Sequence, residues 1–318
     1  GINAEFISLE SVIKQGKFDR TDLDHAFYDY LADIISSEVK KCGDSVPVVT
    51  GNFGVFPGSL LDSVGRGYTD LCAALIASGL LAKELQIWKE VDGIFTADPR
   101  KVKNARLLST ITPEEASELT YYGSEVIHPF TMEQVMRRNI PIRIKNVMNS
   151  LGDGTIVLPD NLAENGWSNN YKINNNGYYS DMSKKQPTAV TIKDGIIVIN
   201  VHSNRKTISH GFFARIFAAL DTHGIIVDLI STSEVHVSMA LSANIAEHEL
   251  HGAIQELKKL GQVDVLKDMA ILSLVGKQMK NMVGIAGKMF STLAAANVNI
   301  EMISQGASEI NISCVIDE

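Results

Sequence analysis

The 318-residue sequence has few cysteines and no long apolar run. Its three cysteines, Cys42, Cys72 and Cys314, lie far apart, and none belongs to a CxxC pair, which argues against a disulfide framework. We interpret them as buried free thiols in a reducing compartment. No apolar stretch reaches the roughly 18 residues that a membrane-spanning helix needs, and no signal peptide is recognisable. We therefore expect a cytoplasmic protein without a membrane partner.

The sequence also lacks an excess of positive charge. It contains 29 Lys and Arg against 37 Asp and Glu, so the formal net charge is -8. This balance argues against a nucleic-acid partner and favours small polar ligands. Apolar residues make up 45% of the chain, which is enough to build cores for two or three domains.

The first 160 residues alternate strand-like and helix-like segments. Strands are expected at 2–9, 46–54, 84–91 and 141–147, and helices at 22–41, 70–79, 112–119 and 130–139. This alternation predicts an α/β domain with a mainly parallel sheet and helices on both faces, in which ligands bind at the carboxyl ends of strands. Because the first strand begins at once after Gly1, we expect the true N-terminus to lie upstream.

A polar segment and an internal repeat follow. Residues 161–187 hold seven Asn between 161 and 176 and predict an exposed linker. Beyond it, residues 211–241 resemble residues 284–316, so one unit occurs twice. The first copy, 188–267, predicts a ferredoxin-like βαββαβ unit. The second copy, 268–318, ends after its third strand, so we expect its last helix and strand to be missing.

The segment "GRGYTD" could bind an anion at the start of a helix. Unsatisfied N–H groups at a helix N-terminus attract negative groups, and Arg66 would add a bidentate donor between two glycines. Thr69 and Asp70 supply a hydroxyl and a carboxylate at the same place. The alternative is an ordinary N-cap by Thr69 or Asp70, and for this motif alone the alternative is favoured.

The segment "WKEVDGIFTADPRKV", residues 88–102, places five charged side chains at the end of a strong strand: Lys89, Glu90, Asp92, Asp98 and Arg100. A parallel sheet would hold a nucleotide there, and Arg100 could reach its phosphates. The Asp-Gly and Asp-Pro pairs are also turn signals, so this segment taken alone is a hairpin.

Three weaker candidates favour structural roles. The "GNFG" segment, 51–54, permits close backbone approach but is common in loops. His128, before a proline, is interpreted as a structural histidine. His248 and His251 lie three residues apart on an expected helix, but no third ligand is near, so we predict no metal site.

Taken together and in this order, "GRGYTD", "WKEVDGIFTADPR", "VIHP" and the two copies "VDLISTSEVHVSMAL" and "IEMISQGASEINISCVI" resemble the aspartokinases, members of the amino-acid kinase superfamily with tandem C-terminal ACT domains. The long polar linker and Glu125 indicate a fungal type. The resemblance implies an incomplete amino-acid kinase α/β/α sandwich over residues 1–160, followed by two ACT units.

The resemblance implies ATP- and Mg²⁺-dependent phosphorylation of L-aspartate to 4-phospho-L-aspartate, the first step towards lysine, threonine and methionine. It assigns one side of the site to aspartate, with Arg66 and Thr69 as ligands and Asp70 as the catalytic residue. The nucleotide side would be lined by Lys89, Glu90, Phe95 and Arg100.

The resemblance also implies feedback control by an end-product amino acid, either threonine or lysine, and a homodimer or higher homo-oligomer formed through the ACT units. The effector residues would come from both copies: Ser209, Gly211, Asp228, Thr232, Ser233, Asn297 and Asn299. Asp228 would bind the effector ammonium group, or could instead be a strand-end residue only.

Two features depart from the family pattern. The phosphate-binding Lys-Phe-Gly-Gly segment has no match and would lie upstream of Gly1, so we expect no catalysis by this chain alone. Glu125 stands where many bacterial members have a Lys, which leaves a phosphate role there in doubt. A regulatory chain that only senses an amino acid, or another amino-acid kinase such as one acting on N-acetylglutamate, are the alternatives.

Overall fold

The computed structural model describes residues 1–10, 12, 25–52, 67–121, 127–159, 186–203, 211–306 and 310–318. The chain forms two compact units, residues 1–184 and residues 185–318. Within the described ranges, no helix has the length and apolar character required to cross a membrane.

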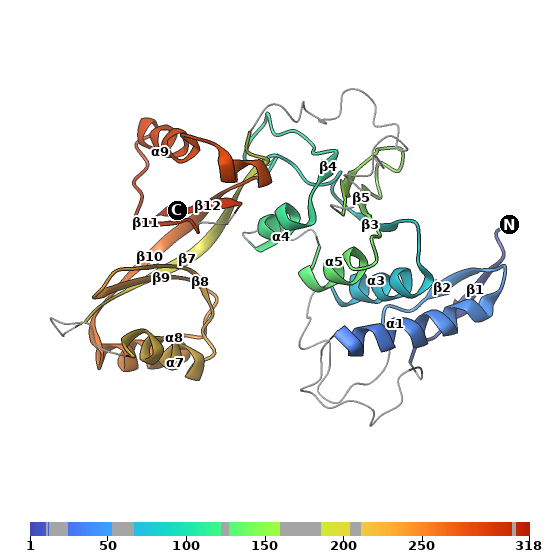
Figure 1. The fold of residues 1–318 in the computed structure, drawn as a ribbon, viewed down its shortest axis with the longest axis horizontal. Helices are drawn as coiled ribbons and strands as arrows, with labels where there is room; N and C mark the ends of the chain where they lie inside the picture. Colours follow the sequence, from blue (N-terminus) through green and yellow to red (C-terminus); the bar gives the residue numbers. More distant parts are fainter. Residues whose placement is uncertain are drawn as a thin grey trace. The chain divides into compact units, whose positions relative to one another are not determined.

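The first unit contains two small sheets and four α-helices among its described residues (Figure 1). Strands β1 (Ala4–Ile7) and β2 (Val46–Val49) pair in parallel. The second sheet has the order β3-β5-β6-β4, in which β3 pairs with β5 and β4 with β6 in parallel, whereas β5 and β6 are antiparallel. Its strands are β3 (Leu85–Lys89), β4 (Thr110–Ile111), β5 (Ile142–Asn146) and β6 (Thr155–Val157). The mainly parallel α/β fold expected from the sequence is confirmed.

The helices of this unit are α1 (His25–Val39), α3 (Tyr68–Leu80), α4 (Pro113–Tyr121) and α5 (Pro129–Met136), and a short 3₁₀ turn covers Lys40–Cys42. Helix α1 buries a stripe at every fourth residue, Phe27, Leu31, Ile35 and Val39, as an amphipathic helix should. Helix α3 packs against it closely, because a Cβ on Gly79 would collide with the Ala32 carbonyl and the Ser36 side chain. Gly79 thus allows the close approach of the two helices near the C-terminal end of α3.

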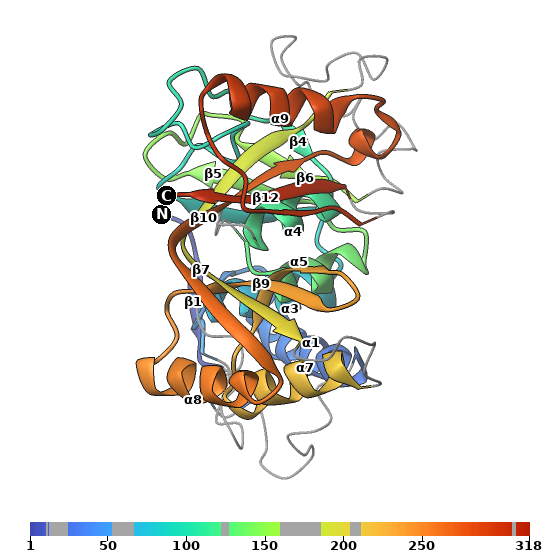
Figure 2. The ribbon, with the colours of Figure 1, turned by 90° about the vertical axis from the view of Figure 1, so that its left-hand side faces the viewer.

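The second unit is a six-stranded antiparallel sheet in the order β11-β12-β10-β7-β9-β8. Its strands are β7 (Ala189–Ser203), β8 (Val227–Thr232), β9 (His236–Ser242), β10 (Gly261–Val275), β11 (Met302–Ser304) and β12 (Asn311–Asp317). Its helices are α7 (Phe212–Thr222), α8 (Glu247–Lys258) and α9 (Ile285–Ala295), with a 3₁₀ turn at Lys277–Asn281. Figure 2 shows the long β7 and β10 spanning this unit, with α9 at one end and α7 and α8 at the other.

Strands β7 and β10 are long enough to contribute to the sheets of both repeats. Residues 196–203 of β7 pair with the first half of β10 and with β9, which builds the first βαββαβ sheet. Residues 189–193 pair with residues 271–275 of β10 and so occupy the fourth-strand position of the second sheet. The repeat had predicted a second sheet without its last strand, but the start of β7 fills that place. Irregular register between Leu266 and Ile271 separates the two halves.

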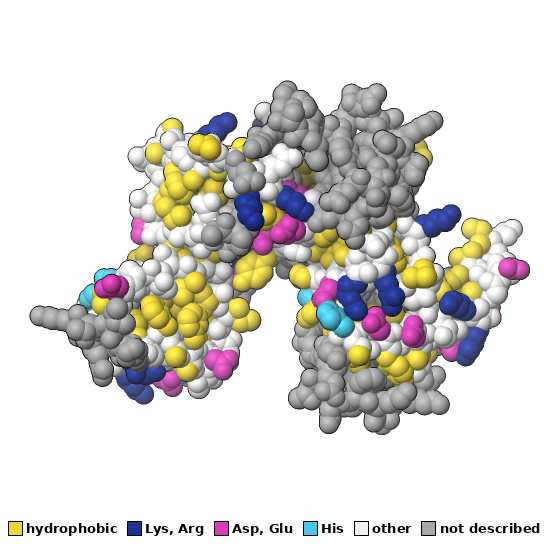
Figure 3. Space-filling view, in the orientation of Figure 1, with side chains coloured by type: hydrophobic (Ala, Val, Ile, Leu, Met, Phe, Trp, Pro, Cys, Tyr) yellow, Lys and Arg dark blue, Asp and Glu magenta, His cyan; other side chains and the backbone are white. Residues whose placement is uncertain are grey.

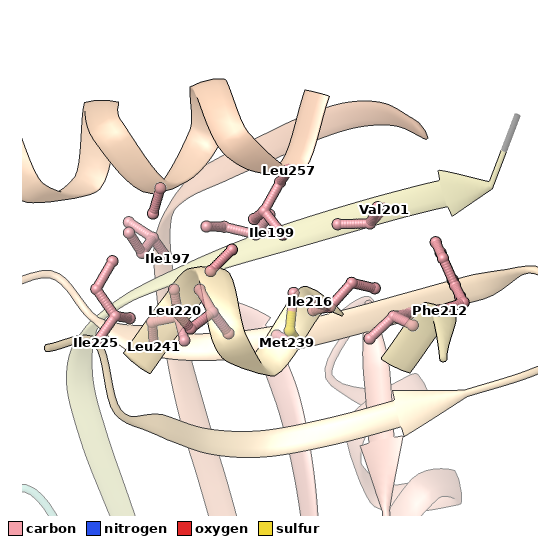
Figure 4. Close-up of a cluster of buried hydrophobic side chains, with 13 residues drawn as sticks. Ile197, Ile199, Val201, Phe212, Ile216, Leu220, Ile225, Met239, Leu241 and Leu257 are labelled. Carbon is pink, nitrogen blue, oxygen red and sulfur yellow. The ribbon is translucent and has the colours of Figure 1, made fainter. Parts of the chain in front are cut away.

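Alternating residues of the first repeat form one core beneath α7 and α8 (Figure 4). Ile197, Ile199 and Val201 of β7 face Ile216 of α7 and Leu257 of α8, and each is 5% exposed or less. The residues between them, such as Asn200 and His202, therefore project from the opposite face of the sheet.

Candidate active site

Helix α3 begins at the "GRGYTD" segment. Its N-cap is Gly67, which has φ 101° and ψ 3° and makes no side-chain cap. Thr69 and Asp70 lie within the first helical turn, so neither is the N-cap residue that the simpler alternative required. The first N–H groups of the helix, Asp70 and the hydroxyl of Thr69 thus lie at one helix end. Arg66, the residue predicted to bind the substrate carboxylate, lies outside the described residues, as do Glu125 and Ser209.

Asp70 makes an ion pair with Lys89, the last residue of β3. The Lys89 Nζ donates a hydrogen bond of 3.0 Å to Asp70 Oδ2, and the two side chains are 30% and 21% exposed. The pair is therefore partly open to solvent, and both charges can be approached by a ligand. The acidic side chain also suits the first turn, where the helix dipole favours negative charge.

The carboxyl ends of β3 and β5 contribute polar side chains that sequence reasoning missed. Lys89 lies directly opposite Asn146 in the parallel register. The amides of Asn146 and Asn149 donate to Asp92 Oδ1 at 3.1 and 3.3 Å. The only sequence signal for this grouping was the rule that ligands bind where parallel strands end. Pairing of β3 with β5 was needed to identify Asn146.

Gly51, the first residue of the "GNFG" segment, lies against the same helix end. Gly51 follows β2, and a Cβ at this position would collide with the side chain of Thr69. The Cys72 thiol, one turn further along α3, donates to the Thr50 carbonyl at 3.6 Å. Burial raises the pKa of Cys72 to about 12, so this thiol is protonated and is not a nucleophile. Glycine at position 51 permits the end of β2 to approach α3.

His128 caps α5 and touches the candidate site. Its Nδ1 accepts a 3.3 Å hydrogen bond from the Phe130 N–H, and its Cβ would lie 3.0 Å from a Cβ added to Gly67. Burial lowers the pKa of His128 below its ordinary value of 6.5, so the neutral imidazole that can accept this bond is favoured. The structural role predicted for His128 agrees with this capping geometry.

The remaining predicted nucleotide residues lie in the segment after β3. Residues 94–96 pair with 106–108, and Phe95 forms an antiparallel bridge with Leu107. Arg100 binds Asp98 through Nε and a terminal nitrogen at 2.9–3.2 Å, and its side chain is 89% exposed. These hydrogen bonds lower the pKa of Asp98. Glu90 is exposed. An antiparallel contact is thus present, but its second side, residues 106–108, lies beyond the segment 88–102 in which the simpler alternative placed a hairpin. Arg100 lies between the two sides and is exposed.

The predicted effector residues occupy three places in the second unit. Gly211 is the N-cap of α7, with φ 76°. Asp228, on β8, pairs with Lys193 Nζ of β7 at 2.8 Å, and its side chain is only 8% exposed. Thr232 and Ser233 are exposed at the far end of β8. Asn297 follows α9 with φ 57°, and Asn299 donates to Glu301.

Comparison with known proteins supports both units. A model of the amino acid kinase family matches residues 1–146, and a model of the ACT domain matches residues 272–318. The aspartokinase of Schizosaccharomyces pombe is 60% identical over 321 residues, a match that includes 100% of this chain and 62% of the relative. The chain therefore spans about three fifths of that relative's length.

Two solved structures of Escherichia coli aspartokinase III are similar in fold. The complex with aspartate and ADP has a TM-score of 0.74 at 27% identity, covering 99% of this chain and 67% of the other. The complex with lysine and aspartate has the same TM-score and identity, covering 99% and 66%.

Proposed function

Because this chain belongs to the aspartokinase family and is of the fungal type, we propose that the complete protein phosphorylates L-aspartate. In this reaction a side-chain carboxylate oxygen of aspartate bonds to the γ-phosphorus of ATP as the bond to the β-phosphate oxygen breaks. The products are ADP and 4-phospho-L-aspartate. The observation that carries the proposal is the Asp70–Lys89 pair, which places a cation beside the N-terminus of α3.

Each described residue would contribute by position and charge. Phosphoryl transfer requires mainly alignment of the reactants and stabilisation of negative charge. The unsatisfied N–H groups at the start of α3, with Thr69 and Arg66, would bind a carboxylate of aspartate. Lys89 would stabilise negative charge on the phosphoryl group, and Asp70 would orient the Lys89 ammonium. Glu90, Phe95 and Arg100 would contact the nucleotide from the segment after β3.

ATP and Mg²⁺ would supply the phosphoryl group and neutralise its charge. Mg²⁺ is usually held by one or two carboxylates together with substrate phosphates. In the part of the chain that the structure describes, no group of three or more His, Cys, Asp or Glu could hold a metal ion. Asp70 and Asp92 already accept hydrogen bonds from Lys89 and from two Asn amides. This donor set fits an ion bound mainly through the phosphates of ATP.

The decisive experiment measures aspartate-dependent ADP formation by the full-length protein, with N-acetylglutamate as the competing substrate. We expect ADP only with aspartate and Mg²⁺. ADP formed with N-acetylglutamate instead would replace this proposal with another amino-acid kinase. If the full-length protein forms no ADP but binds threonine or lysine in calorimetry, it is a sensing chain. The 318-residue chain assayed in parallel tests the expectation that it is inactive alone.

We further propose that the second unit binds the end-product amino acid and forms the homo-oligomer. The effector carboxylate would lie at the start of α7, near Gly211, and its ammonium group near Asp228. Because Lys193 already neutralises Asp228, effector binding would have to exchange or share this partner. Titrating threonine and lysine against activity identifies the effector. Asp228→Asn should weaken inhibition with little change in uninhibited turnover, and full inhibition of this variant would contradict the role.

A further inference from the structure

Two histidines that are 34 positions apart in the sequence meet across the sheet of the second unit. His202 near the end of β7 pairs in register with His236 at the start of β9. Their Nδ1 atoms are 3.1 Å apart, and the ring centroids are separated by 4.0 Å with planes inclined by 35°. Since the nitrogens are closer together than the ring centres, the two rings converge on their Nδ1 side.

Both histidines lie on the exposed surface of the sheet, on the face opposite the core side chains. His202 alternates with Val201, which is 1% exposed and belongs to the core beneath α7 and α8. Both histidines therefore project from the opposite face, and both are exposed. Figure 3 shows histidine side chains at the surface of this unit. Side chains directly opposite each other on neighbouring strands are close enough to act together.

The spacing of the two nitrogens matches a shared metal ion. Imidazole nitrogens bind zinc at about 2.0–2.1 Å, so two of them on one tetrahedral ion are about 3.3 Å apart. The observed 3.1 Å separation requires only a small opening of the pair. Without a metal, one Nδ1 must carry a proton and donate the hydrogen bond, and the other Nδ1 must be unprotonated and accept it. Two protonated or two unprotonated Nδ1 atoms cannot form this bond.

The surroundings suit a cation and leave the rest of its coordination open. His202 lies opposite Gln262 on β10, and Asp264 follows two residues later on the same face. The Gln262 amide donates to Asp264, so a carboxylate lies on this face of the neighbouring strand, two residues from the position opposite His202. No group of three ligating side chains occurs in the described ranges. An ion here would therefore have two protein ligands, with water in the remaining positions.

We propose that His202 and His236 form a binding site for a divalent transition metal ion, of the kind that imidazole favours: Zn²⁺, Ni²⁺ or Cu²⁺. The bound ion would link β7 to β9. It would do so next to Ser233, whose N–H donates to the His236 carbonyl at 2.9 Å. The site is independent of the phosphoryl-transfer residues, all of which belong to the first unit.

The experiment is isothermal titration of the full chain with ZnCl₂ at pH 7.5. We expect His202→Gln and His236→Gln each to remove one equivalent of binding, or to weaken it at least tenfold. His248→Gln and His251→Gln are matched controls on α8, and we expect wild-type binding from both. Zn²⁺ should also raise the melting temperature of the wild-type chain but not that of His202→Gln, because binding to the native state alone stabilises it.

Wild-type zinc stoichiometry and affinity in both cross-strand variants would overturn the proposal and leave the pair as a hydrogen-bonded contact. Equal losses in the α8 controls would also overturn it, because they would indicate non-specific binding by surface histidines. Melting temperatures recorded without zinc establish that each variant is folded. Because both histidine rings are exposed, we expect each variant to fold and to melt near the wild-type temperature without zinc.

Discussion

The ammonium of Lys89 and the carboxylate of Asp70 lie 3.0 Å apart, although 19 positions separate the two residues in the chain. The contact connects the end of β3 to the first turn of α3. Lys89 therefore brings a positive charge to this helix end, and Asp70 restrains the position of its ammonium group. The pair therefore provides the most direct test of the proposed phosphoryl transfer.

Replacing Lys89 by Met in the full-length protein should lower kcat for aspartate phosphorylation by about 100-fold or more, the usual effect of removing one charge-stabilising donor. Asp70→Asn should also lower kcat, because Lys89 loses its orienting partner. Lys41→Met is the matched control, since Lys41 pairs with Glu38 on the surface of the same unit. A wild-type kcat for Lys89→Met would contradict the assignment.

Variants of Arg100 and Asp98 can distinguish two roles of Arg100: contact with the nucleotide, or stabilisation of the turn through Asp98. If Arg100 binds phosphate, Arg100→Ala should raise the KM for ATP several-fold with little effect on the KM for aspartate. Asp98→Asn should not raise it, because this change frees the exposed guanidinium from its partner. Steady-state kinetics of both variants provide the test. Equal increases in the two variants would mean that the pair only holds the turn.

Gly67→Ala should destabilise the first unit by more than the roughly 1–2 kcal/mol that a left-handed backbone costs an L-residue. The extra cost arises because the new Cβ would lie 3.0 Å from the Cβ of His128. Gly284→Ala is the control, since its φ of 83° is similar and nothing lies within 4 Å. Hydrogen exchange of α3 and α9 measures the two effects locally. Equal destabilisation would show that the contact with His128 is not limiting.

The stability of the first unit should decrease as the pH falls below about 6.5 because of His128. Burial lowers its pKa in the folded state, so the unfolded chain takes up the proton first. The free energy of unfolding is therefore fully retained above 6.5 and is lost progressively down to the lowered pKa. His128→Asn can still cap α5 but cannot titrate. Urea unfolding at pH 7.5 and 5.5 should show a smaller loss for the variant, and an identical loss would exclude His128 as the cause.

Local signals in the sequence predicted most of the secondary structure. The four-residue apolar spacing of α1, the small residues of α3 and the repeated ACT pattern all describe contacts close along the chain. The predicted helices over 22–41 and 70–79 correspond to α1 and α3. The limits of β7 and β10 were not predictable in the same way. Their 15-residue lengths depend on partners contributed by both repeats.

The sequence by itself determined the family, the α/β and ACT organisation, and the helix that begins at "GRGYTD". Periodicity and motif order carry this information because each depends on residues near one another in the chain. Only the tertiary structure decided that Lys89 contacts Asp70, that Asn146 joins Asp92, and that His202 meets His236. The first pair depends on how helix α3 packs beside the end of β3, and the second on β3 and β5 ending side by side. The third depends on the register of β7 and β9, where a shift of one residue would place each histidine on the opposite face.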